Sequence, residues 1–351
     1  MSRLFHLTSC ASPLVLLAGG AVAEGELNAL VWCDHTDPAL IEPFEAAHDV
    51  KVNLREYEGT GAALAVLEQS RPGDWDVLVI DGIDVFRAVE AGILAPLPED
   101  ALPTGDIFPE VVMAENNSVD GVTYAVTEKF GYNTISYNSD KVDPADMESL
   151  ATVWSEKYEG RISIYDYYLP VMGLAAIAEG IATAEIGGDS LEAIGGVLGT
   201  MRSRAASVAG VVAAQTALAT GEVDIVVGGG EWLTAVLASE QPQLTWTIPE
   251  DGAVRWAQSI GVVAGSESPE LALEFIKYIM SPEGQARLAT SSCFWGMPAN
   301  SKAGDVLTDA QKEILRWDSQ PNYLARTQLY PAPDADLDAE MQDLWLETLQ
   351  Q

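Results

Sequence analysis

The chain has 351 residues, a length typical of two domains of about 150 residues each. Its 53 acidic and 18 basic residues give a formal net charge of −35, which argues against nucleic acid or an anionic membrane as a partner. The hydrophobic content of 48% is that of a folded globular protein rather than a disordered one.

Residues 1–23 are interpreted as a signal peptide. Arg3 supplies a positive charge, residues 13–22 form a short apolar segment, and Ala21-Val22-Ala23 is a small-x-small cleavage site. A sequence resembling a lipoprotein box ends at Cys10, but it precedes the apolar segment, so lipidation is not expected. We therefore predict a protein of the periplasm that is cleaved near Ala23.

Two cysteines, Cys33 and Cys293, follow the signal peptide. An exported protein meets an oxidising environment, and two thiols allow one pairing. A disulfide between these two loops and a pair of free thiols are both compatible with the sequence.

Strands and helices alternate along residues 27–92. Apolar residues predict strands at 27–31, 50–57 and 76–80, and helical spacing predicts helices from Pro38, at 61–68 and at 83–91. Asp37 is the expected N-cap of the first helix. This order indicates a mostly parallel sheet with helices on both faces, whose ligands bind beyond the carboxyl ends of the strands.

Residues 133–137, after a break at Gly131, are expected to cross into a second lobe, and residues 259–264 to return. The second lobe would hold strands at 161–165 and 223–227 and a helix from Leu169. Ser-Pro-Glu at 268 and at 281 predicts two helix starts. The expected fold is α/β and two-lobed, with lobe 1 at 24–131 plus 261–305 and lobe 2 at 132–260 plus 306–351.

Several short motifs carry a family resemblance between residues 26 and 305. They are Trp32 after the first strand, Gly73 to Val79, Val153 to Gly160, Thr220 to Asp224, Ser268 to Gly284, and Met297 to Asn300. In their order and spacing the chain resembles the bacterial extracellular solute-binding proteins of ABC importers, nearest to the spermidine/putrescine-binding group. The resemblance implies a type II-like periplasmic binding protein fold with two crossover strands. It also implies a monomer that captures a small solute for the permease subunits of the transporter.

The resemblance carries only some binding positions over to this chain. Trp32 and Trp256 match the family's tryptophans, whereas Gln258 stands where polyamine binders carry aspartate. Asp81 stands in place of a serine and His35 in place of an aromatic residue. The family's acidic pair falls near Tyr167 and Pro170, next to Asp166. These departures leave the identity of the solute open.

The expected cleft combines aromatic rings with carboxylates, the groups that bind an amine cation. We predict a small cationic or zwitterionic amine as ligand, with no cofactor and no catalytic activity. The predicted binding residues are Trp32, Asp34, His35, Asp81, Asp166, Tyr167, Glu231, Trp256 and Gln258.

Three alternatives remain open. The Gly228-Gly229-Gly230 run could cradle an anion, with Arg161 or Arg255 as a clamp for an amino acid or carboxylate. The pair Tyr167-Tyr168 is compatible with a ferric-ion carrier. Asp34 and Asp81 could form the two carboxylates of a hydrolase.

Overall fold

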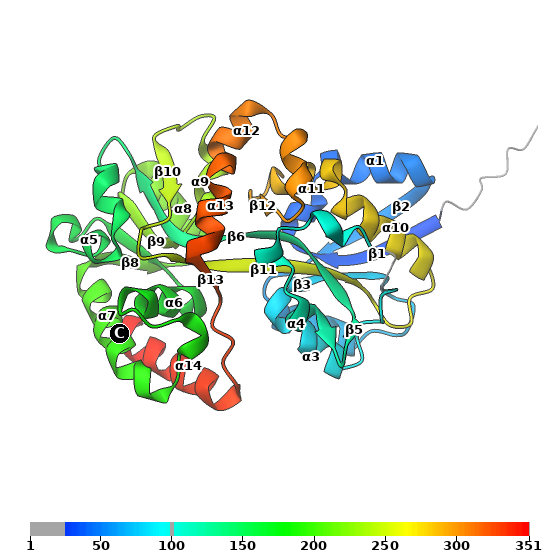
Figure 1. Cartoon of the computed structure of the whole chain (residues 1–351), viewed down its shortest axis with the longest axis horizontal. Coiled ribbons are helices and arrows are strands. Elements are labelled where there is room, and N and C mark those ends of the chain that lie inside the picture. The colour runs from blue at the N-terminus through cyan, green and yellow to red at the C-terminus, as the bar shows by residue number, and fades with distance from the viewer. Residues whose placement is uncertain (1–24, 99–101, 351) are drawn as a thin grey trace, which may run out of the picture.

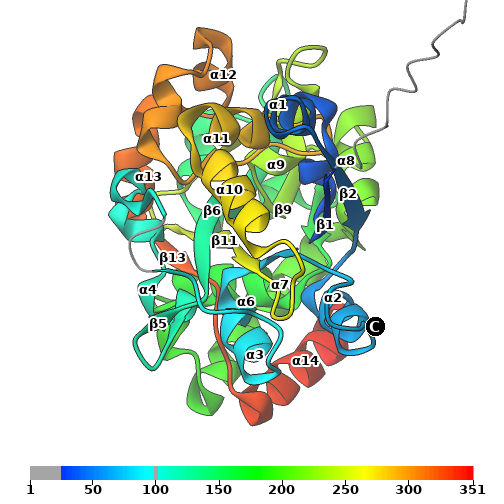
Figure 2. The same ribbon diagram turned by 90° about the vertical axis from the view of Figure 1, so that its right-hand side faces the viewer.

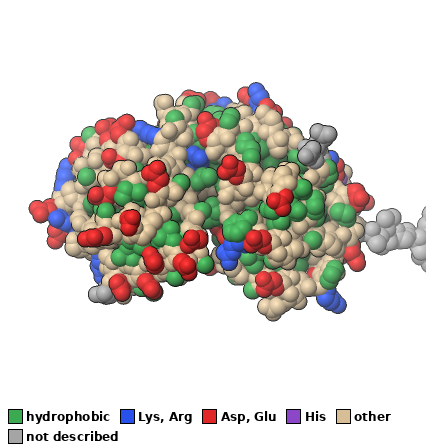
Figure 3. Space-filling model, turned by 60° about the horizontal axis from the view of Figure 1, so that its bottom comes forward, with side chains coloured by type: hydrophobic (Ala, Val, Ile, Leu, Met, Phe, Trp, Pro, Cys, Tyr) green, Lys and Arg blue, Asp and Glu red, His purple; other side chains and the backbone are tan. Residues whose placement is uncertain are grey.

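The computed structural model describes residues 25–98 and 102–350, so the predicted signal peptide lies outside the described residues. Helices pack around one long, curled sheet of 11 strands that passes through two lobes, which confirms the predicted two-lobed α/β fold (Figure 1). The main strand order is β2-β1-β3-β11-β6-β9-β7-β8. Acidic side chains are spread over both lobes on the face shown in Figure 3, whose outline is indented between them.

Lobe 1 is built on the parallel strands β1 (Gly25–Val31), β2 (Val50–Glu56) and β3 (Val77–Asp81). Helices cover both faces of this part of the sheet (Figure 2). On one side lie α1 (Pro38–His48), α10 (Pro269–Met280) and α11 (Pro282–Ala289), and on the other α2 (Thr60–Glu68) and α3 (Val85–Glu90). The strands and helices predicted for residues 27–92 are therefore confirmed, with ends shifted by a few residues.

Lobe 2 contains β7 (Ile162–Tyr165), β8 (Ala205–Ala209), β9 (Ile225–Gly229) and β10 (Leu244–Thr247). Its helices are α6 (Tyr168–Ala178), α7 (Leu191–Arg204), α8 (Val211–Thr220) and the short α9 (Glu231–Thr234). Among the small elements, α4 (Ala114–Asn117), β4 (Ser118–Val119), β5 (Val122–Thr123) and β12 (Met297–Pro298) belong to the lobe 1 half, and α5 (Leu150–Val153) to the lobe 2 half.

Two long antiparallel strands, β6 (Ala125–Asn138) and β11 (Ala253–Val262), join the lobes. Every residue of both strands is buried, as expected for strands covered on both faces. The predicted break at Gly131 is wrong. The strand runs through this glycine because neighbouring side chains, rather than a turn, require the absence of a Cβ there.

Serine and aspartate caps account for the ends of several helices. Asp37 accepts a hydrogen bond from the Ala39 N–H at 2.9 Å, and Ser281 accepts one from the Gly284 N–H at 3.0 Å, which confirms both predicted caps. The helix predicted after Ser268 also forms, although the Ser268 side chain makes no capping hydrogen bond.

The chain after residue 305 forms α12 (Asp309–Ile314), α13 (Gln320–Arg326), β13 (Thr327–Leu329) and α14 (Ala335–Leu349). Strand β13 pairs with β11, and α14 packs against α7 and α6 of lobe 2. The exact domain boundaries stay a prediction. In the described part of the chain, no helix has the length and apolar character needed to cross a membrane.

Candidate functional site

A row of polar side chains crosses the sheet where the lobes meet. Asp81 of β3 lies opposite Gln258 of β11, which in turn lies opposite Lys129 of β6. Directly opposed residues project from the same face of a sheet, so these three side chains share one face. Gln258 is buried, and its Oε1 atom has no hydrogen-bond partner among the described residues.

Trp256 projects from the same face as Gln258, since it lies two residues away along β11. Its partner in β6 is Gly131, where a Cβ would lie 2.2 Å from the indole ring and 2.0 Å from Oε1 of Glu231. The Glu231 carboxylate is fully buried and accepts a hydrogen bond from the Tyr132 backbone N–H at 3.1 Å. Glycine at position 131 therefore allows the indole ring and the carboxylate to meet at the strand that joins the lobes.

The two carboxyl groups at this site are protonated more readily than usual. Burial raises the pKa of Asp81 to about 7, and the charge of Asp84 adds to the effect. Burial also raises the pKa of Glu231 to about 8, although hydrogen bonds from backbone N–H groups and the charge of Lys129 act in the opposite direction. In the part of the chain that the structure describes, neither carboxylate forms an ion pair with a basic side chain.

A small cavity lies between the ends of β3 and β13. Asp81 and Ile83 line it from lobe 1, Leu329 and Tyr330 line it from the C-terminal segment, and Trp256 of β11 lies between them. Its volume of about 10 Å³ leaves room for about one water molecule. The residues that line this cavity therefore nearly fill it.

Tyr330, which lines this cavity, belongs to a cluster of three tyrosines. Tyr165 and Tyr330 both contact Tyr167 edge-on, with ring centroids 6.0 and 5.9 Å from that of Tyr167. Burial raises the pKa of each hydroxyl, and the charge of Asp81 raises it further, so the cluster faces that carboxyl group across the cleft. The Tyr330 hydroxyl donates to Oδ1 of Asn133 at 2.6 Å. Tyr330 was not predicted, because it lies in the tail where the resemblance is poor.

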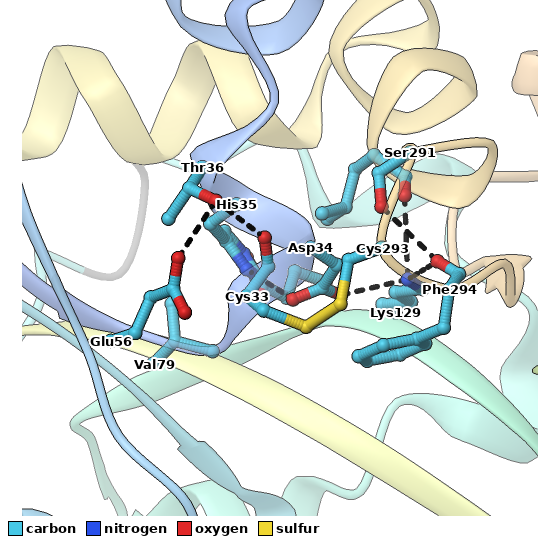
Figure 4. Close-up of polar contacts among 12 residues, drawn as sticks. Cys33, Asp34, His35, Thr36, Glu56, Val79, Lys129, Ser291, Cys293 and Phe294 are labelled. Carbon is cyan, nitrogen blue, oxygen red and sulfur yellow. Dashed lines mark hydrogen bonds and ion pairs between the residues drawn. A yellow bond between two sulfur atoms is a disulfide. The ribbon is translucent and has the colours of Figure 1, made fainter. Parts of the chain in front are cut away.

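Asp34 and His35 belong to a fully buried network of charges (Figure 4). His35 lies between two carboxylates, with Nδ1 2.9 Å from Asp34 and Nε2 2.8 Å from Glu128. Lys129 contacts the other oxygen of Asp34 at 2.7 Å. Although burial opposes it, the charges of Glu128 and Asp34 raise the pKa of His35 to about 10, so the imidazole is protonated at neutral pH.

A β-bulge explains how consecutive residues of β6 reach one network. Lys129 pairs with Gln258 and Thr127 with Ser259, so Glu128 is an extra residue without a partner in β11. Successive side chains normally point to opposite faces of a strand, but a bulge redirects one of them. Glu128 and Lys129 can therefore both meet the loop that carries Asp34 and His35. Glu128 and Lys129 are the two charged residues of the buried strand β6, and this adjacent pair was the sequence signal for the network.

Cys33 and Cys293 form a disulfide, with their Cα atoms 6.0 Å apart. The bond connects the loop after β1 with the loop after α11 and lies beside the charge network (Figure 4). Trp32, which precedes Cys33, packs its ring against Tyr57, with ring centroids 4.9 Å apart, and its buried Nε1 has no hydrogen-bond partner within residues 25–98 and 102–350. The disulfide thus holds one wall of the predicted site.

The remaining candidate residues contact other groups of the protein, although Arg255 also lines the cavity at Asp81. Asp166 accepts hydrogen bonds from Trp345 and Gln350 of the C-terminal segment. The Arg161 side chain forms an ion pair with Asp224. The Arg255 guanidinium donates to backbone oxygens of Glu110 and Thr327.

The Gly228–Gly230 run serves close packing. A Cβ on Gly230 would lie 2.1 Å from the Tyr132 carbonyl oxygen, and one on Gly229 would lie 2.6 Å from the Ser136 hydroxyl oxygen. Among residues 25–98 and 102–350, no group of three or more histidine, cysteine, aspartate or glutamate side chains could hold a metal ion.

Residues 39–314 match the family model of the bacterial extracellular solute-binding proteins. The chain belongs to this family. The solute-binding protein is 24% identical over 289 residues to the spermidine/putrescine-binding periplasmic protein of Escherichia coli, covering 78% of this chain and 81% of the relative. It is 26% identical over 318 residues to iron uptake protein A1 of Synechocystis, covering 84% and 83%.

Among solved structures, the solute-binding protein superimposes with a TM-score of 0.80 on the substrate-binding protein of a spermidine/putrescine ABC transporter from Streptococcus pneumoniae. The alignment covers 93% of this chain and 99% of the other, at 18% sequence identity. The similarity establishes the two-lobed fold of a periplasmic binding protein.

Proposed function

We propose that this protein binds a small cationic or zwitterionic amine in the cleft between its lobes and delivers it to the permease subunits of an ABC importer. One observation carries the proposal. The fully buried Glu231 and the partly buried Asp81 lie beside Trp256, and neither has an ion-pair partner in the described part of the chain. A buried carboxylate without a counterion is costly, and an ammonium ion would supply that counterion.

The neighbouring groups suit the same ligand. The indole of Trp256 and the rings of Tyr165 and Tyr167 offer faces that attract a cation, by roughly 0.5–2 kcal/mol each. The unpartnered Oε1 of Gln258 can accept a hydrogen bond from an ammonium N–H. Several relatives are named for spermidine or putrescine, which supports the amine class without fixing its member.

The proposed role in transport is supported by the relatives and by the expected signal peptide. Relatives are named as periplasmic or as ABC transporter components, and export of this chain would follow from the signal peptide expected at residues 1–23. The monomeric state and the absence of catalysis and of nucleic-acid binding stay predictions.

The ligand proposal is tested by isothermal titration calorimetry of the mature protein with putrescine, spermidine and ω-amino acids. We expect saturable binding of at least one amine. Asp81→Asn should weaken it about 10- to 100-fold, because a charge-assisted hydrogen bond is worth about 1.5–3 kcal/mol. The exposed Asp189→Asn variant serves as control and should bind normally.

Trp256→Ala should abolish amine binding while the protein stays folded by circular dichroism. Failure of every amine to bind, or wild-type affinity in both site variants, would refute the proposed ligand class.

A further inference from the structure

The Lys129 ammonium is enclosed in the manner of a bound amine. Its Nζ atom lies 2.7 Å from Oδ2 of Asp34 and 3.3 and 3.4 Å from the carbonyl oxygens of Leu288 and Phe294. It also lies 4.3 Å from the centroid of the Phe294 ring, and the side chain is fully buried. A carboxylate, carbonyl oxygens and an aromatic face are the groups that hold an ammonium ion away from water. The three ammonium hydrogens thus have three acceptors.

This ammonium position adjoins the proposed ligand cleft. Lys129 and Asp81 flank Gln258 on neighbouring strands, which places their Cα atoms about 10 Å apart, or two strand spacings. A Cβ on Gly296 would lie 2.5 Å from Cε of Lys129 and 3.0 Å from Cη2 of Trp256. The lysine side chain therefore passes beside the indole ring of Trp256, which also lines the cavity at Asp81.

We propose that Lys129 determines specificity by filling, with its own ammonium, a second amine position beyond Trp256, so that the cleft selects short amines over long ones. The inference rests on the proposed function, since it concerns the length of amine that the same cleft accepts. A long amine reaching past Trp256 toward Asp34 would meet a like charge and acceptors that are already occupied. Asp81 and Glu231 remain for the ligand's own ammonium.

The first test asks whether the position binds an added amine when the lysine is removed. Lys129→Ala deletes the equivalent of n-propylammonium, so this compound is the matched probe, and n-propanol and sodium chloride are its controls. The melting temperature of Lys129→Ala should be below that of the wild type and should rise saturably with n-propylammonium but not with n-propanol.

The control variant Lys277→Ala loses a partly exposed lysine that is paired with Glu274. In this variant and in the wild type, n-propylammonium should change the melting temperature no more than sodium chloride does. If Lys129→Ala is isolated unfolded, the same compounds are compared for recovery of folded protein. A response to n-propylammonium no larger than in the controls, or no recovery with it, would overturn the inference.

The second test measures selectivity by calorimetry. The ratio of the spermidine Kd to the putrescine Kd should fall about tenfold in Lys129→Ala relative to wild type, since the freed Asp34 can accept the additional ammonium. An unchanged ratio in a variant that binds both amines would refute the selectivity. If the wild type binds no amine, the proposed function fails, while the n-propylammonium response still decides whether position 129 is an ammonium site.

Discussion

Replacing His35 by glutamine should destabilise the fold at neutral pH and make its stability less sensitive to alkaline pH. His35 is fully buried between Asp34 and Glu128, and the pair Asp34–Lys129 completes a network of two acids and two bases. Glutamine can still donate a hydrogen bond, but it removes a positive charge. The substitution therefore leaves one buried carboxylate uncompensated, a change that costs about 3–5 kcal/mol.

The pKa of His35 gives a second value for the contribution of the imidazole charge to the free energy of unfolding. A folded-state value of about 10, against 6.5 for an ordinary histidine, corresponds to about 5 kcal/mol, since one pKa unit is worth about 1.4 kcal/mol. Because the folded-state pKa is raised, this stabilisation is fully present below pH 6.5 and is lost as the pH rises through about 10. The free energy of unfolding of the wild type should therefore exceed that of His35→Gln by several kcal/mol at neutral pH. This difference should become smaller toward pH 10.

Urea denaturation from pH 6 to 10 measures this gap. The control is His48→Gln, because His48 is exposed at the end of α1, and it should remain within about 0.5 kcal/mol of wild type. A His35→Gln variant as stable as wild type at pH 7, or a gap that stays constant to pH 10, would show that the buried imidazole is not a cation.

Three further outcomes are expected. The double substitution Cys33→Ser and Cys293→Ser should lower the free energy of unfolding by about 2–5 kcal/mol, because the disulfide spans a sequence separation of 260. An unchanged midpoint of urea denaturation would contradict this expectation. Gly131→Ala should lower the melting temperature and weaken amine binding, since its Cβ would lie 2.0 Å from the Glu231 carboxylate; wild-type behaviour would show that the strand can shift freely. Amine affinity should rise between pH 6 and 9 as Asp81 and Glu231, with pKa values of about 7 and 8, lose their protons; calorimetry showing no pH dependence would remove them as ligand groups.

Local patterns in the sequence were enough to predict the strands that form lobe 1 and the edge at which Asp81 lies. Continuous apolar runs mark strands buried on both faces, and a residue just after such a run falls at the carboxyl end of the sheet. Asp81 and Gln258 lie opposite each other because of the register between β3 and β11, two strands that are distant in sequence. Local sequence patterns do not determine that register, so this pair could not be predicted.

The environment of Asp34 and His35 depends on a β-bulge in β6, and no local sequence pattern predicts this bulge. Without the bulge, Glu128 would point away from Lys129, and the imidazole would lack its second carboxylate. Whether Asp34 and His35 contact a ligand stays a prediction, although both are buried and already paired. Tyr330 reaches the cavity through the pairing of β13 with β11, a contact made late in the chain with a strand far from it in sequence.

The small volume between Asp81 and Tyr330 has a kinetic consequence. A space of about 10 Å³ admits no amine, so entry requires the lobes to separate or side chains to swing aside first. Uptake would then proceed from the open fraction of molecules alone, and the measured affinity would be weaker than the intrinsic affinity by that fraction. In stopped-flow experiments the observed association rate would reach a plateau at high amine concentration, and the height of that plateau would report how often the protein opens.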